Sequence, residues 1–252
     1  MKVLVTNLKT SPERRAHMIK EFEGKGVDYT FVDCVIGKDL TDEELNEKCD
    51  MKKINQFNKD YEWFTKGVIG ATLTNHKNCR TLLDSNDKMA MFMEDDTVLP
   101  DNLKDILDEI EHKALPGDLI LLFYLTYSTL KLKPIDDSKA GRFFIPLNPE
   151  VIHGGSAVIY TRESAKGTME YNTPIKMSPD SWKFLLDEGC IKRLICLYPP
   201  PIDTADFRST LDYVKDGFIK RLLHSNPLTR FVLKMRRKFR KASKRKIVVV
   251  NE

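Results

Sequence analysis

Short apolar runs alternate with segments of helical periodicity along the first 125 residues. Apolar runs predict strands at 2–8, 27–35, 88–94 and 117–125. Apolar positions spaced three or four residues apart predict helices at 11–26, 41–54, 70–87 and 100–114, with a loop at 55–70. Strands that alternate with helices predict an α/β fold with a mostly parallel, Rossmann-like sheet and helices on both faces.

The pattern weakens beyond residue 125 but continues. "GRFFIPL" and "HGGSAVIYT" are typical of strands, whereas "TRESAKGTMEY" and "SPDSWKFLLDEG" are typical of helices. We therefore expect one domain over residues 1–216, followed by a separate tail at 217–252.

Three acids, Glu94, Asp95 and Asp96, directly follow the apolar run 89–93. Ligands of an open α/β sheet bind beyond the carboxyl ends of its strands. Adjacent carboxylates repel each other, and Mg²⁺ or Mn²⁺ completed by substrate phosphates would relieve that repulsion. The alternative is a solvated turn that caps the next helix.

The first strand-to-helix turn, "NLKTSPERR", favours an anionic ligand. Asn7 ends the strand, Ser11 is a natural N-cap, and Arg14 and Arg15 can donate forked hydrogen bonds to a base, a ribose or a phosphate. A capped helix with an exposed basic face is the alternative. Neither GxGxxG nor GxxxxGK[ST] occurs, which disfavours NAD-type and P-loop nucleotide binding.

Composition indicates a soluble globular protein. Hydrophobic residues make up 41% and charged residues 31% of the 252 residues, and no apolar run approaches the length of a membrane span. The N-terminal apolar stretch is too short for a signal peptide. The five cysteines include no CxxC pair, so we expect reduced thiols in a cytoplasmic protein.

Charge is distributed unevenly. Residues 217–252 contain twelve Lys or Arg and one acid, so the tail carries +11 and the body −7. Phe231, Met235 and Phe239 recur every four residues among these cations, which predicts an amphipathic helix at 231–246 on an anionic membrane surface. A solvated charged segment is the alternative. The acidic body argues against nucleic acid as a partner.

Six motifs in order resemble glycosyltransferase family 25, the lipopolysaccharide and lipooligosaccharide sugar transferases of Gram-negative bacteria. They cover roughly residues 1–212 and depart from the family pattern at Ala71, Asn75 and Gly155-Ser156. The motifs are "VTNLKTSPERR", "FVDCVIGKDL", "GVIGATLTNHKNC", "MFMEDDTVL", "HGGSAVIYTRESAKGTM", and "SPDSWKFLLDEG" with "DFRSTL".

The resemblance implies a GT-A fold and an inverting transfer of a sugar, most commonly galactose from UDP-galactose, with Mn²⁺ or Mg²⁺ on the diphosphate. The implied product is β-linked, with β-1,4 expected. The implied acceptor is a lipid-linked oligosaccharide at the inner face of the inner membrane. Another metal-dependent α/β enzyme such as a phosphohydrolase, or a basic-tailed binding module, remains an alternative. The donor sugar, the acceptor and the oligomeric state are not determined by the sequence.

Site residues follow from these motifs. Asp180, at the start of a predicted helix, is the expected general base, with Asp203 and Asp206 as rivals. Glu94, Asp96 and His153 are the expected metal ligands, and Asp95 is a further candidate for the metal or the ribose. The expected nucleotide-sugar-binding residues are Asn7, Leu8, Arg14, Asp33, His76, Asp95, Gly155 and Ser156.

Overall fold

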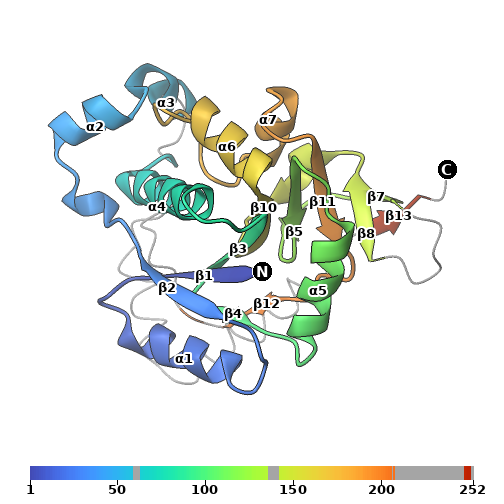
Figure 1. Ribbon diagram of the computed structural model, residues 1–252. Coiled ribbons are helices and arrows are strands. Elements are labelled where there is room, and N and C mark those ends of the chain that lie inside the picture. The colour runs from blue at the N-terminus through green and yellow to red at the C-terminus, as the bar shows by residue number, and fades with distance from the viewer. Residues whose placement is uncertain (59–62, 136–141, 206, 208–246, 251–252) are drawn as a thin grey trace, which may run out of the picture.

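The computed structural model describes residues 1–58, 63–135, 142–205, 207 and 247–250. A nine-stranded sheet forms the centre, with helices on both faces (Figure 1). The helices are α1 (Pro12–Phe22), α2 (Asp42–Lys48), α3 (Met51–Phe57), α4 (Lys66–Leu83), α5 (Leu103–Lys113), α6 (Arg162–Tyr171) and α7 (Trp182–Asp187), with 3-10 turns η1 (Gly37–Asp39) and η2 (Pro149–Val151). The sheet strands are β1 (Lys2–Asn7), β2 (Tyr29–Asp33), β3 (Met89–Glu94), β5 (Asp118–Leu121), β7 (Leu130–Pro134), β8 (Phe143–Pro146), β10 (Ala157–Thr161), β11 (Arg193–Leu197) and β13 (Ile247–Val249).

The strand order is β13-β7-β8-β11-β5-β10-β3-β1-β2. Strands β2, β1 and β3 are parallel to one another, as are β5 and β11. Strand β10, however, is antiparallel to both of its neighbours, β3 and β5. The chain enters β10 at the edge where β3 ends, with no crossover helix before it, and an antiparallel direction follows. The α/β fold with helices on both faces is confirmed, but the sheet is mixed and not mostly parallel.

Two hydrophobic cores cover the two faces of the sheet. In β1 the buried side chains alternate, so Val3 and Val5 face one core and Leu4 the other. The first core also contains Met18 of α1 and Leu103 of α5. The second contains residues of α4, α6 and α7. Central strands buried on both faces explain the continuous apolar runs that predicted them.

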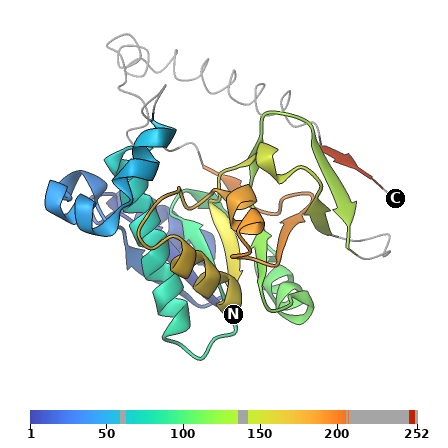
Figure 2. The same ribbon diagram turned by 90° about the horizontal axis from the view of Figure 1, so that it is seen from above.

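The helix predicted at 41–54 is two helices, and part of the predicted loop at 55–70 is helical. Cys49 is extended (φ −126°) and ends α2, and Asp50 begins α3 by accepting a hydrogen bond from Lys53 N at 3.0 Å. Both helices pack over the start of α4 around a small third core. Seen from above, they lie at one end of the molecule and β13 at the other (Figure 2).

Part of the tail predicted at 217–252 belongs to the sheet. Strand β13 adds to the sheet as an edge strand parallel to β7, with Ile247 paired to Leu130. The amphipathic helix predicted at 231–246 lies outside the described residues, as does Asp206. Among the described helices, none is both long enough and apolar enough to span a bilayer.

Candidate functional site

Three parallel strands end side by side, and their last residues form one edge of the site. The register pairs Asn7 of β1 with Asp33 of β2, and Thr6 with Glu94 of β3. Strand β10 starts opposite the end of β3, and Glu94 N donates to Ser156 O at 2.8 Å. Residues expected from four distant motifs are therefore neighbours because the strands that carry them are hydrogen-bonded to one another.

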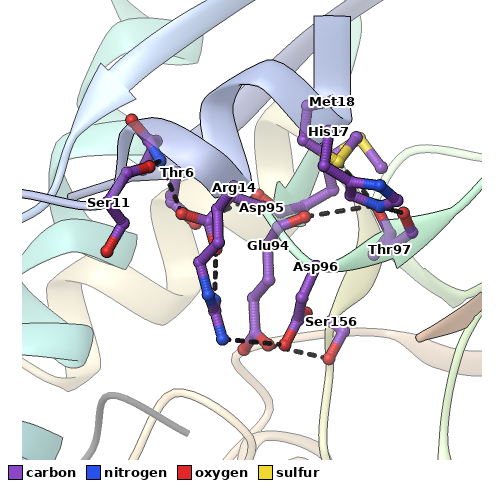
Figure 3. A network of polar contacts seen from close by, with 12 residues as sticks. Thr6, Ser11, Arg14, His17, Met18, Glu94, Asp95, Asp96, Thr97 and Ser156 are labelled. Atoms are coloured by element: carbon purple, nitrogen blue, oxygen red, sulfur yellow. Dashed lines mark hydrogen bonds and ion pairs between the residues drawn. The ribbon is translucent and has the colours of Figure 1, made fainter. Parts of the chain in front are cut away.

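Asp95 is the centre of a buried polar cluster (Figure 3). Its Oδ2 accepts a hydrogen bond from Asn7 Nδ2 at 2.6 Å, and its Oδ1 pairs with Arg14 Nη1 of α1. Asn7, Arg14 and Asp95 are 3%, 6% and 5% exposed. Asp95 is therefore not part of a solvated turn, although Glu94 is exposed and Asp96 half-buried, and α5 begins only at Leu103. Asn7, Arg14 and Asp95, which are expected to bind the donor, contact one another in this cluster.

The two carboxylate oxygens of Asp96 differ in their hydrogen-bond partners among the described residues. Its Oδ2 lies 3.4 Å from Arg14 Nη2, while its Oδ1 is buried and has no hydrogen-bond partner among the described residues. Burial raises the pKa of Asp96, and Asp95 adds to this effect while Arg14 opposes it. A buried carboxylate oxygen without a donor is unfavourable, so this atom is suited to a cation.

Glu94 reaches the same region from the last position of β3. Its Oε2 accepts a hydrogen bond from Ser156 Oγ at 2.8 Å. Desolvation raises the pKa of Glu94 to about 7, with Asp96, Asp95 and Asp180 adding to the shift and Ser156 opposing it. The side chain is nevertheless accessible to solvent. Both properties hold for a carboxylate that is surrounded by protein but open to solvent on one side, where a ligand can reach it.

Asp180 is connected to Glu94 through the segment 153–156. Its Oδ2 accepts a hydrogen bond from Gly154 N at 3.1 Å, and its Oδ1 accepts one from Ser178 Oγ at 2.8 Å. Its charge contributes to the raised pKa of Glu94, after burial and the neighbouring acids. Asp180 lies in a turn before α7 and not in the first turn of that helix. Two hydrogen bonds, and not a helix dipole, therefore orient this carboxylate.

Trp182 is a site residue that the sequence did not reveal. Its Nε1 donates to Gly154 O at 3.1 Å, and a Cβ on Gly155 would lie 2.6 Å from its indole ring. Packing against Trp182 thus favours glycine at 155, a residue that the family resemblance predicts to bind the donor. Ser156, also expected to bind the donor, donates a hydrogen bond to Glu94.

His17 and Phe207 also lie at the site, although the sequence did not indicate them as site residues. His17 Nε2 lies 2.8 Å from Thr97 O, and its ring packs edge-to-face on Phe207, which also lies beneath the Arg14 guanidinium. His17 shares one face of α1 with Arg14 because the two are three residues apart, a spacing visible in the sequence. The contact with Phe207 joins segments far apart in the chain and leaves no local pattern.

Asp33, Leu8 and His153, three further expected ligands, have no described side-chain contact with the buried cluster. Asp33 is exposed and pairs with Lys9 Nζ at 3.0 Å, although its backbone borders Asn7. Leu8 is half-buried, and its carbonyl accepts a hydrogen bond from Ser11 N. His153 is exposed and its ring contacts Tyr127. Within the described ranges, no three His, Cys, Asp or Glu side chains are grouped to hold a metal ion, so Glu94, Asp96 and His153 are not assembled as a set.

His76 lies in a cavity of about 520 Å³ formed by one face of α4, the end of α2 and the segment after α6. Its Nε2 is buried and has no partner among the described residues. Burial lowers the pKa of His76 to about 4, and Arg80 adds to the effect. No described contact joins His76 to the acids at 94–96. The cavity lining includes Lys48, Leu73, Lys77, Arg80, Asn172 and Ile175.

Comparison with known proteins identifies the family. The model of glycosyltransferase family 25 (LPS biosynthesis protein) matches residues 1–147. The chain belongs to glycosyltransferase family 25. The family resemblance is thereby confirmed, and with it the prediction of a glycosyltransferase of lipopolysaccharide biosynthesis. No curated protein matches the chain.

Two solved structures are similar at low scores. A putative glucose-1-phosphate thymidylyltransferase from Bacillus anthracis in complex with a sucrose has a TM-score of 0.37 at 8% identity, covering 78% of this chain and 85% of that one. An active-site mutant of LgtC has a TM-score of 0.38 at 8% identity, covering 83% and 88%. Scores this low carry no weight for the function.

His76→Gln should change the pH dependence of stability. Between pH 6.5 and 4 the unfolded histidine takes up a proton that the folded one does not, so the wild type loses stability as the pH falls. The variant lacks this loss. Its free energy of unfolding relative to wild type should rise by about 2–3 kcal/mol from pH 7 to pH 4.

Urea unfolding across this pH range measures the difference. His112→Gln, at an exposed position on α5, is the matched control and should follow the wild-type curve. Parallel curves for His76→Gln and wild type would show that the folded protein binds the proton at His76 as readily as the unfolded chain does.

Proposed function

We propose that this chain is an inverting transferase that moves galactose from UDP-galactose onto a lipooligosaccharide or lipopolysaccharide acceptor, forming a β linkage, β-1,4 by expectation. The observation that carries the proposal is the buried, unpartnered Oδ1 of Asp96 beside Glu94 at the ends of parallel strands. That edge is where α/β sheets bind nucleotides. Family membership favours this function over a phosphohydrolase or a basic-tailed binding module.

The residues present fit a divalent cation. Asp96 and Glu94 would hold Mn²⁺ or Mg²⁺, since one or two carboxylates with substrate phosphates and water are an ordinary ligand set for these ions. The cation would supply charge neutralisation for the departing diphosphate. Burial and the neighbouring acids raise the pKa of both carboxyl groups, so each has electrostatic strain that a positive charge would relieve. His153 is not included in this set, because its ring contacts Tyr127.

The remaining roles follow from the contacts. Arg14 and Asn7 hold Asp95, which fixes the backbone between Glu94 and Asp96. Asp33 accepts a hydrogen bond from a ribose or uracil of the donor, and its exposure at the end of β2 supports this role. Asp180 accepts the proton of the acceptor hydroxyl as that oxygen forms the bond to the anomeric carbon. The bond from that carbon to the diphosphate breaks, and UDP leaves with the electron pair.

The first test is metal-dependent turnover of a panel of UDP-sugars. We expect release of UDP from one donor with Mn²⁺ and none with chelator. Asp96→Asn should lower the rate by about a hundredfold or more, because the cation then loses a charged ligand. Asp101→Asn, at an exposed acid paired with Lys25, is the control and should retain the wild-type rate. Absence of both UDP binding and turnover, with or without metal, would reject the proposed function.

Asp180→Asn separates proton transfer from donor binding. The variant keeps a side-chain oxygen for Gly154 N but cannot take up the acceptor proton. Transfer should fall by about 10²- to 10⁴-fold while the dissociation constant for UDP stays unchanged. Asp203→Asn is the comparison, since Asp203 is the rival base that the structure describes. Near-normal transfer by Asp180→Asn, or a loss of transfer in Asp203→Asn alone, would show that Asp180 is not the general base.

An anionic membrane surface is the proposed partner of residues 231–246. Each cation near such a surface contributes about 1 kcal/mol, so a cluster of cations suffices for reversible attachment. The intact protein should sediment with liposomes that contain anionic lipid at moderate salt, and not with neutral liposomes. A variant with Gln in place of the Lys and Arg residues of 234–246 should stay in the supernatant. Equal sedimentation of both proteins would exclude these cations as the attachment.

A further inference from the structure

The segment His153–Gly154–Gly155–Ser156 contacts a different partner at each of four consecutive positions. The His153 ring lies against Tyr127, Gly154 N donates to Asp180, Gly155 packs on Trp182, and Ser156 Oγ donates to Glu94. The Cα atoms of His153 and Ser156 are three residue steps apart, so the distance between them is at most about 11 Å. The ring pair is therefore tied by a short backbone to the proposed base and the proposed metal-binding acid.

Tyr127 and His153 form an accessible aromatic surface. Their ring centroids are 5.4 Å apart, with the ring planes inclined by 39°. Tyr127 is 64% exposed and His153 is also exposed. The short strands β6 (Leu125–Thr126) and β9 (Ile152–His153) pair in antiparallel fashion and hold the two rings next to each other. An apolar ring surface kept in water by paired backbone is suited to a ligand with one apolar and one polar face.

We propose that Tyr127 and His153 bind the acceptor sugar ring by stacking against its apolar face. The proposal rests on the proposed transferase function and names its acceptor subsite. A pyranose presents C–H groups on one face and hydroxyl groups around its rim, so a ring stacked here can direct a hydroxyl towards Asp180. Gly154, next to His153 in the chain, holds that carboxylate in place.

Three variants test the acceptor subsite. Tyr127→Ala should raise the KM for the acceptor roughly three- to tenfold, the loss expected for one aromatic contact, with metal-dependent donor hydrolysis unchanged. Tyr127→Phe keeps the ring and should keep the KM. Leu115→Ala is the matched control. Leu115 is 54% exposed but precedes the start of β5, which lies at the other end of the strands from Glu94. Lactose, glucose and N-acetylglucosamine serve as acceptor probes.

His153→Phe distinguishes stacking from metal binding. It keeps an aromatic ring and removes both nitrogens, so donor hydrolysis and the acceptor KM should persist. Loss of metal-dependent donor hydrolysis in this variant would overturn the assignment of His153 to the sugar. An acceptor KM within twofold of wild type in Tyr127→Ala, with donor hydrolysis intact, would overturn the stacking surface.

Sugar binding without turnover separates this proposal from the proposed function. Saturation-transfer NMR would measure the binding of lactose, glucose and N-acetylglucosamine to the wild-type protein and to Tyr127→Ala. If the wild type hydrolyses no UDP-sugar, the proposed function fails. In that case a sugar signal that is lost in Tyr127→Ala still supports the stacking surface, and a signal that is absent from the wild type or unchanged in the variant overturns it. Unfolding temperatures equal to wild type verify that each variant folds.

Discussion

The site depends on one buried charge, the carboxylate of Asp95. An ion removed from water costs several kcal/mol unless its partners are placed to compensate. Here Arg14 of α1 and Asn7 at the end of β1 are those partners, so the turn after β3, the first helix and the end of the first strand are joined at one point. Glu94 and Asp96, on either side of Asp95, take their positions from this arrangement. Loss of Arg14 would leave a buried carboxylate without its counter-charge and would displace both neighbours.

Three consecutive acids do not have three equivalent roles. Successive side chains at the end of a strand point in different directions, and their surroundings differ accordingly. Asp95 points into the cluster, Glu94 reaches Ser156, and Asp96 keeps one oxygen without a partner. Arg14 compensates the charges of Asp95 and Asp96 to different degrees, because it pairs directly with Asp95 and lies 3.4 Å from a single oxygen of Asp96. Burial raises the pKa of both Glu94 and Asp96, and the neighbouring acids add to the effect, so under the proposed mechanism a cation would stabilise their ionised forms.

Much of this arrangement could be predicted from local pattern. The apolar run before Glu94 indicated a buried strand, and the convergence of strand ends at one edge brought Asn7, Asp33 and Glu94 to the same place. Long-range contacts could not be predicted. The direction of β10, the break between α2 and α3 at Cys49 and the contact of Phe207 with Arg14 each depend on segments distant in the sequence. The cavity that His76 lines also brings together segments distant in the sequence, so no local pattern indicated it.

The segment 153–156 explains how one short piece of chain can couple the two halves of a transfer reaction. Under the proposed mechanism the leaving group is held near Glu94 and the attacking hydroxyl near Asp180, and the anomeric carbon must lie between them. Ser156 and Gly154, which contact these two carboxylates, are only two residues apart. Trp182 packs against Gly155 between them, where any side chain would collide with the indole. A shift of this backbone would therefore disturb the contacts to the proposed base, the proposed metal-binding acid and the proposed acceptor surface together, because the residues that make these contacts are consecutive in the chain.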